Sequence, residues 1–417
     1  MVVVYDVEAL KPSSAAGDIK AVDEVTGSAY DEMVAWRRWF HANPELSFKE
    51  FNTAIKVKEI LLSFGIEEKD IICEVGVTGI CAMIYGGHEG PCVMLRADMD
   101  ALPLTETAEI DYKSTNEGVM HACGHDGHMS ALLGAAKVIF QERATLKGSV
   151  KLCFQPAEEG KNGAGAMIKD GLLEGDRKCA GTPRVDFVYG IHLWSYARLG
   201  VIQCSEGPVM AASDKFIVDV KGKGGHGAVP EGTVDAIVSA SNVVGAFNTL
   251  VSRNVSPLKT GVVTIGTIQG GSGYNIIADT VSMTGTARSF EPEIQELIKG
   301  RMEEVCCGVE KVYGGQVSLR YEYGYPPTIN SYPEEVARVR ASAAKVLDMD
   351  RVSHVQKTMG AEDFSFFLQE RPGCFFFVGA AHQGDIRPHH KSIFDFDERA
   401  LLVSASTFIT LIRDMLT

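Results

Sequence analysis

Basic residues and long apolar runs are both scarce in this sequence. Forty Lys and Arg stand against 54 Asp and Glu, which leaves a formal net charge of −14. Because nucleic acids and anionic membranes bind basic surfaces, this balance argues against either one as the main partner. No apolar run reaches the roughly 20 residues that a membrane-spanning helix needs. The acidic Asp6 and Glu8 follow a short apolar start, and the first arginine is Arg37. This is unlike a secretory or mitochondrial targeting segment, so we expect a cytoplasmic protein.

Cysteine pairs at repeating intervals are also missing. The ten cysteines are scattered, and several lie in apolar, strand-like runs such as residues 149–155. In a chain of this kind they are expected to be buried thiols and not disulfides. Cys123 is the exception, because it stands among histidines. The 417 residues exceed what one compact core usually contains, which predicts two domains.

Two kinds of hydrophobic pattern divide the chain. Residues 1–30 show no periodicity and are expected to form a loose N-terminal leader. Strand-like runs then alternate with helical ones, which predicts an α/β domain with a largely parallel sheet. The helical runs are 30–40, 48–64 and 130–140, and the strand-like runs are 79–85, 91–97, 149–155 and 185–191.

From residue 211 the order of predicted elements changes to β-α-β-β-α-β. That order is typical of a ferredoxin-like α+β unit with a four-stranded antiparallel sheet and two helices. The unit ends at Pro326-Pro327, after which the α/β pattern resumes. We therefore expect one catalytic α/β domain made of residues 31–210 and 327–417, interrupted by an inserted domain over residues 211–326.

The densest group of reactive side chains is the segment His121–His128, which contains three His, one Cys, one Asp and two glycines. The glycines permit a tight turn in which Cys123 and His125 aim at one point, and thiolate with imidazole suits Zn, Mn, Fe, Co or Ni. The alternative is an ordinary helix N-terminus with Asp126 as its cap and the histidines on the surface.

Further candidates follow predicted strands, where sites of α/β proteins normally lie. In Glu158-Glu159 one carboxylate can bind metal while the other moves a proton, although an ordinary acidic turn is the alternative. Asp98 is a candidate ligand, an orienting partner for a bound His, or simply an ion-pair partner of Arg96. His192 follows the run 185–191 and is otherwise a satisfied core histidine.

Six segments together resemble the metal-dependent amidohydrolases that include hippurate hydrolases, N-acyl-amino-acid hydrolases and plant auxin-conjugate hydrolases. The resemblance covers about residues 31–415, and it implies a zinc-peptidase-like catalytic domain whose inserted domain serves as a lid and dimer interface. The six segments are Arg96–Pro103, His121–His128, Gln155–Gly160, Gly190–Trp194, Gly222–Pro230 and Met359–Phe364.

The resemblance also implies a role for individual residues. Two divalent metal ions (Zn, Mn, Co or Ni) would be bound by one shared set of ligands, namely Cys123, His125, Glu159, His192 and His390. Counting back from Phe394 selects His390 over His389, but Ser392 stands where the family usually has proline, so both stay open. Glu158 is the implied general base.

In the inserted domain, His226 resembles a residue that polarises the scissile carbonyl, Asn275 resembles a substrate contact, and Arg288 suits a substrate carboxylate. The predicted reaction is hydrolysis of N-acyl amino acids, N-acetyl or N-benzoyl, by a metal-activated water, in a homodimer formed through the inserted domain. Two alternatives remain open. One is a Cys-dependent amidase that uses Cys123 as nucleophile, with His125 or His121 as its partner, and the other is a metal-holding but non-catalytic binding protein.

Overall fold

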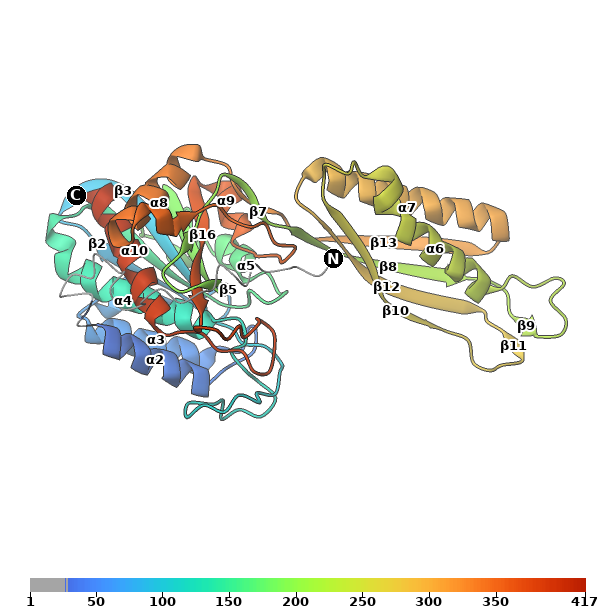
Figure 1. Cartoon of the computed structure of the whole chain (residues 1–417), viewed down its shortest axis with the longest axis horizontal. Coiled ribbons are helices and arrows are strands. Elements are labelled where there is room, and N and C mark those ends of the chain that lie inside the picture. Colours follow the sequence, from blue (N-terminus) through green and yellow to red (C-terminus); the bar gives the residue numbers. More distant parts are fainter. Residues whose placement is uncertain (1–26, 28) are drawn as a thin grey trace. The chain divides into compact units, whose positions relative to one another are not determined.

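The computed structural model describes Gly27 and residues 29–417, and the expected leader falls almost wholly outside this range. The described chain forms two compact units (Figure 1). The first contains the residues up to Gly207 together with Ile329–Gln356 and Phe366–Thr417, and the second contains Pro208–Thr328 and Lys357–Ser365. The domain boundaries expected from the sequence are not tested by this division and stay a prediction. No helix among the described residues combines the length and apolar character needed to cross a membrane.

The first unit is built on an eight-stranded sheet with the order β1-β2-β4-β3-β5-β16-β6-β15. Its central strands β4, β3, β5 and β16 run parallel, whereas β2 is antiparallel to both β4 and β1. The strands are β1 (Ile71–Val75), β2 (Gly79–Tyr85), β3 (His88–Asp98), β4 (Lys147–Gln155), β5 (Phe187–Arg198), β6 (Ile202–Gln203), β15 (Val352–Ser353) and β16 (Gly373–Ala381). The carboxyl ends of the parallel strands therefore meet at one edge.

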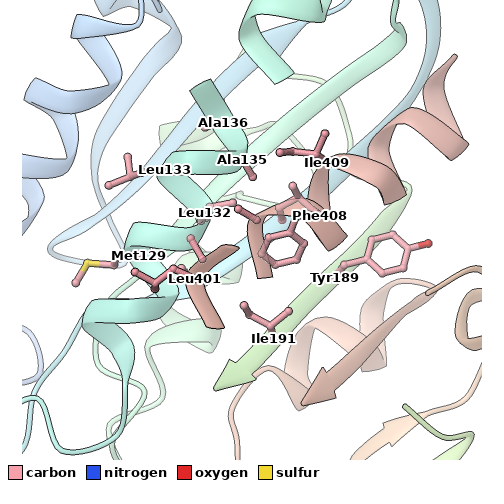
Figure 2. Close-up of a cluster of buried hydrophobic side chains, with 14 of the residues drawn as sticks. Met129, Leu132, Leu133, Ala135, Ala136, Tyr189, Ile191, Leu401, Phe408 and Ile409 are labelled. Atoms are coloured by element: carbon pink, nitrogen blue, oxygen red, sulfur yellow. The ribbon is translucent and has the colours of Figure 1, made fainter. Parts of the chain in front are cut away.

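Helices accompany this sheet, and several of them pack against it through apolar faces. They are α2 (Tyr30–Ala42), α3 (Phe51–Ser63), α4 (His125–Glu142), α5 (Gly163–Lys169), α8 (Pro333–Val346), α9 (Ser365–Glu370) and α10 (Arg399–Leu416). Figure 2 shows side chains of α4 and α10 meeting beside Tyr189 and Ile191 of β5. Leu132 of α4 and Phe408 of α10 are fully buried there, and burying a side chain of this size stabilises a fold by roughly 1.5–3 kcal/mol. This packing fixes the start of α4 against the sheet.

The second unit has the β-α-β-β-α-β order in β8 (Ala212–Lys221), α6 (Ala236–Asn254), β10 (Gly261–Gly270), β12 (Thr280–Ser289), α7 (Pro292–Tyr313) and β13 (Gln316–Tyr325). Its antiparallel sheet has the order β10-β12-β8-β13. Phe216 of β8 and Phe247 of α6 lie in its own apolar core. Short strands pair separately, β9 (Gly225–His226) with β11 (Ile276–Ile277), and β7 (Gly207–Met210) with β14 (Thr328–Asn330).

Two element boundaries near the candidate site differ from the expectation. Helix α4 begins at His125 and not at Ser130, so His125 and Asp126 lie inside its first turn. The left-handed φ of +94° at Gly124 turns the chain directly into the helix, a conformation that glycine adopts without steric cost. Strand β5 continues past Ile191 to Arg198 because it keeps pairing with β16 after its pairing with β3 ends at Gly190. His192 therefore lies within a strand.

Candidate active site

Four chain segments meet where the central parallel strands end. Strands β3 and β4 pair in parallel up to Asp98 and Gln155, so the residues that follow each strand emerge at the same edge. Strand β5 loses its β3 partner beyond Gly190, which leaves the next residues of β5 next to that edge. Helix α4 begins there as well, and this topology brings the predicted site residues of the first unit together.

The two ring nitrogens of His125 have different surroundings, with Nε2 lying 3.6 Å from Asp98 Oδ2. Its Nδ1 lies 2.8 Å from the main-chain oxygen of Asp100, and because a carbonyl only accepts, Nδ1 must donate. The opposite nitrogen, Nε2, is buried and makes no hydrogen bond to any described residue. Burial opposes a proton on this ring, but Asp98 and Asp100 raise the pKa of His125 to about 10. The surroundings of the ring therefore favour positive charge at this point.

His192, like His125, has its Nδ1 held by a main-chain oxygen. Its Nδ1 donates to the main-chain oxygen of Leu193 at 2.7 Å, and its Nε2 lies 3.5 Å from Sγ of Cys123. Burial, the first cause, and the nearby His128 lower the pKa of His192 well below its usual value. A neutral ring with Nδ1 protonated leaves the Nε2 lone pair directed at the thiol, which is the tautomer that a metal-binding imidazole uses.

Glu158 and Glu159 are held by the carboxylate of Asp100. The main-chain N–H of Glu158 donates to Asp100 Oδ1 at 3.0 Å, and that of Glu159 donates to Asp100 Oδ2 at 3.1 Å. Ala157, just before them, has a left-handed φ of +55°, a strained backbone of the kind that clusters at functional sites. Glu158 is buried. The two carboxylates are thus anchored through their main chain.

His389 and His390 lie in different surroundings. The Nε2 atom of His390 lies 3.2 Å from Glu159 Oε1. In contrast, Nε2 of His389 accepts the main-chain N–H of Ser195 at 3.1 Å, and its ring stacks on Trp194 with centroids 5.0 Å apart. The geometry therefore favours His390 as the residue that faces the other candidate ligands.

His128 lies in the same sequence cluster but has both ring nitrogens engaged. Its Nδ1 donates to Asp98 Oδ1 at 2.6 Å, and its Nε2 accepts the N–H of Leu193 at 2.8 Å. Asp98 also accepts from Arg96 Nη1 at 2.7 Å. Of the three roles considered for Asp98, the ion pair with Arg96 is present. Asp98 also orients the ring of His128, which lies beside His192.

The candidate ligands fall into overlapping groups. Ligand atoms lie within 4.8 Å of one another in the set Cys123, His125, His192, in the set Cys123, Glu159, His390, and in the set His125, Glu158, Glu159. Cys123 belongs to the first two sets and His125 links the third. His121 is in none of the groups found among the described residues.

These residues fit divalent metal ions. Thiolate, imidazole and carboxylate are the donors that transition-metal sites use. The buried Nε2 of His125 makes no hydrogen bond to any described residue, and buried polar atoms of this kind need a partner. A cation bound beside it would supply one.

The remaining predicted site residues lie in the second unit. The structure brings two of them together, because Gly227 N–H donates to the main-chain oxygen of Asn275 at 2.8 Å and His226 pairs with Ile276. His226 and Asn275 are both exposed. Arg288 is on β12, where its Nη1 donates to the main-chain oxygen of Met359 at 3.3 Å.

Sequence reasoning did not single out Asp100 as the anchor of Glu158 and Glu159. Its only signal was a second acidic residue two positions after Asp98, just past the end of a strand. That spacing alone does not distinguish an anchor from a solvated side chain, because the donors to Asp100 come from a distant loop.

A parallel-centred sheet with thiolate, imidazole and carboxylate donors at its carboxyl edge indicates a metal site of an α/β protein. The model of peptidase family M20/M25/M40 matches residues 94–414, and the chain belongs to this family. Its relatives include proteins named as amidohydrolases and deacetylases, and the chain is a hydrolase of the amidohydrolase type. The fold class and the family expected from the sequence are thereby confirmed.

Individual relatives resemble the chain over most of its length. An N-acetyl-L-cysteine deacetylase of Bacillus subtilis (strain 168) is 38% identical over 378 residues, which cover 91% of this chain and 86% of the relative. An IAA-amino acid hydrolase, ILR1-like 4, of Arabidopsis thaliana is 37% identical over 383 residues, covering 90% and 84%. A Bacillus subtilis crystal structure described as a dinuclear metal binding peptidase from the M20 family has a TM-score of 0.80 and 31% identity, covering 93% and 99%.

Proposed function

We propose that this protein hydrolyses the amide bond of N-acyl amino acids to a carboxylic acid and a free amino acid. The observation that carries the proposal is the adjacent carboxylate pair. Glu159 faces His390 at 3.2 Å, while Glu158, buried beside it, shares a group with His125. One carboxylate is thus placed among metal donors and its neighbour is placed to handle a proton.

Two divalent ions, Zn, Mn, Co or Ni, would be held by Cys123, His125, Glu159, His192 and His390. In such a site a divalent ion acts as a Lewis acid toward water and toward a carbonyl oxygen. The protein's own contribution is orientation, because main-chain carbonyls fix Nδ1 of both His125 and His192 and thereby direct each Nε2 at the site.

Glu158 is the proposed general base. It takes a proton from the water that attacks the amide carbon, and then delivers a proton to the leaving nitrogen of the amino acid. The hydrogen bond from its main-chain N–H to Asp100 restricts the movement of the Glu158 backbone. A base held in this way loses little orientational freedom during the reaction.

The amino-acid half of the substrate carries a carboxylate, and Arg288 is the proposed partner for it. Burial lowers the pKa of this guanidinium, and only Asp214 acts in the opposite direction. An anion beside Arg288 would therefore offset the solvation that its charge loses on burial. The named substrates of the two relatives, N-acetyl-L-cysteine and an IAA-amino acid, share an amide nitrogen next to such a carboxylate. His226 is the proposed donor to the scissile carbonyl, and Asn275 is a proposed substrate contact.

A homodimer through the second unit is part of the same proposal. Strand β10 is at the edge of its sheet, and most of its residues are exposed, with Ile268 55% exposed. An exposed edge strand of this length is a template for pairing with a second copy. Sedimentation at several concentrations measures this, and we expect Ile268→Lys to shift the parent toward monomer; a parent that is already monomeric refutes the dimer.

The deciding experiment compares Glu158→Gln with the parent and with Glu67→Gln, an exposed control that pairs with Lys69 at the surface. Bound metal is measured by elemental analysis, and hydrolysis is measured on N-acetyl, N-benzoyl and indole-acetyl amino acids. We expect Glu158→Gln to keep its metal but lose at least about 100-fold in kcat, and the control to match the parent. Equal rates in Glu158→Gln and the parent would refute the assignment.

The Cys-dependent alternative has one observation in its favour, the 3.5 Å approach of Cys123 to His192. That partner differs from His125 and His121, which the sequence suggested. A chelator separates the two mechanisms, because a thiol nucleophile works without metal whereas the proposed reaction stops. The non-catalytic alternative is excluded if the parent hydrolyses any compound in the panel.

A further inference from the structure

Arg37 on α2 is a fully buried guanidinium with three carboxylate partners. Its Nε lies 2.9 Å from Asp126 Oδ2, its Nη2 lies 2.7 Å from Asp395 Oδ1, and its Nη1 lies 3.3 Å from Glu398 Oε1. The guanidinium also stacks on the ring of Phe396, 4.4 Å from its centroid. None of these residues belongs to the proposed reaction.

The partners of Arg37 come from the two segments that carry candidate metal ligands. Asp126 follows His125 in the first turn of α4. Asp395 follows His390 in the segment that leads to α10. These segments are far apart in the sequence, and Arg37 joins them with a hydrogen bond to each. Arg37 is thus one side chain that links the His390 segment to the start of α4.

Asp126 and Asp395 each have a second partner besides Arg37, because Nδ1 of His41 lies 2.8 Å from the same Asp126 Oδ2. Burial opposes their charge, but Arg37 holds the pKa of Asp126 well below its usual value, and His382 with Arg37 does the same for Asp395. His382 Nε2 lies 3.1 Å from Asp395 Oδ2. His382 and Asp395 are therefore in contact at the two ends of the segment that contains His390.

His390 needs such a constraint more than the other candidate ligands do. It is exposed, and its backbone has a left-handed φ of +59°, which a non-glycine residue adopts only when its surroundings enforce it. Its own main-chain N–H donates to the oxygen of Ala122 at 2.8 Å, so the same two segments touch once more beside Cys123.

We propose that Arg37 is a positioning residue that fixes the His390 segment onto the start of α4 and thereby sets the affinity of the metal ion bound through Cys123, Glu159 and His390. This inference rests on the proposed two-metal site. Arginine is required because its planar fork bonds several carboxylates in separate directions, which the single ammonium of lysine does not do. The ion bound through Cys123, His125 and His192 depends on the His390 segment far less.

The test uses three full-length variants loaded with Zn²⁺. Arg37→Lys keeps the charge but not the fork. Asp395→Asn keeps the shape and the arginine but removes one charge, and it decides the question if Arg37→Lys does not fold. Arg38→Met is the matched control, because Arg38 bonds the same Glu398 from an exposed position and contacts neither Asp126 nor Asp395.

The first readout is zinc retained per chain after equilibration with a graded series of chelator concentrations. We expect both Arg37→Lys and Asp395→Asn to keep one equivalent as tightly as the parent and to bind the second at least about tenfold more weakly. Excess Zn²⁺ should restore kcat toward that of the parent, which a general loss of packing would not permit. Arg38→Met should match the parent in both measurements.

Two results would overturn the inference: unchanged affinity for both equivalents, or equal weakening of both. Either leaves the proposed function intact as long as the parent binds two equivalents and hydrolyses N-acyl amino acids. A parent that binds fewer than two equivalents refutes the two-metal proposal itself, and the role of Arg37 falls with it.

Discussion

Replacing Asp100 with asparagine should impair catalysis and stability together. The Asp100 carboxylate accepts the main-chain N–H groups of Glu158 and Glu159 and the hydroxyl of Ser47 at 2.7 Å. An asparagine side chain has one accepting oxygen, so in either orientation its NH₂ group faces a main-chain donor. Losing a hydrogen bond to a charged group costs about 1.5–3 kcal/mol, and leaving a buried donor unsatisfied costs about 1–3 kcal/mol. We therefore expect Asp100→Asn to lower the free energy of unfolding by ~2.5–6 kcal/mol.

The effect on the rate follows from the same contacts. A displacement of Glu158 by ~1 Å lowers the rate by on the order of 100-fold. Initial rates on an N-acetyl amino acid and urea unfolding of the metal-free chain measure the two effects. Ser47→Ala is the control, since it removes one hydroxyl donor but leaves both main-chain bonds, and should cost about 1 kcal/mol and change the rate by less than about threefold. The reasoning is refuted if Asp100→Asn works at the parental rate, or if Ser47→Ala lowers the rate as much.

Three further outcomes are expected. Burial raises the pKa of Glu50 from 4.5 to about 7, so its protonated form is favoured in the folded chain and stability is lost as the pH rises through that range. Glu50→Gln should therefore gain up to about 3 kcal/mol relative to the parent between about pH 4.5 and about pH 8, read as a change in slope from urea unfolding of metal-free protein; parallel pH profiles would contradict this. His390→Gln should lose one zinc equivalent by elemental analysis while His389→Gln keeps both, and the reverse result would move the ligand to His389. Leu132→Ala should lower the thermal unfolding free energy by about 2.7–5 kcal/mol without changing activity per folded molecule, and an unchanged melting temperature would show that the helix packing is described wrongly.

Most of the fold could be predicted because its core strands are continuous apolar runs. The run 79–85 became β2 with the same bounds, and the β-α-β-β-α-β order expected from residue 211 is present in the second unit. The end of β5 could not be predicted, because beyond Ile191 it is held by pairing with β16, a strand far along the chain. The start of α4 was missed since histidine and aspartate are weak helix formers, and burial against the sheet overrides that preference.

The candidate site was predictable in residue type but not in role. Spacing placed Cys123 and His125 in one turn, yet it did not distinguish His125 from His128. That distinction depends on which acceptor each Nδ1 meets, Asp100 O for one and Asp98 Oδ1 for the other. The contact of Arg37 with Asp395 spans most of the sequence and has no local signal. The roles of the individual ligands, of Glu158 and of the second-unit residues stay predictions.

The first unit consists of separate stretches of the sequence, and this affects its folding during translation. A ribosome releases the strands that end at Gln155 and Arg198 early, but His390 and α10 emerge only after the whole intervening unit. At ~5–20 residues per second, the stretch between Gly207 and His390 takes on the order of 10 s or more. During that time the apolar side of α4 lacks its α10 partner (Figure 2). The nascent protein therefore exposes an unfinished core that chaperones would recognise, and its last candidate metal ligand emerges close to the end of translation.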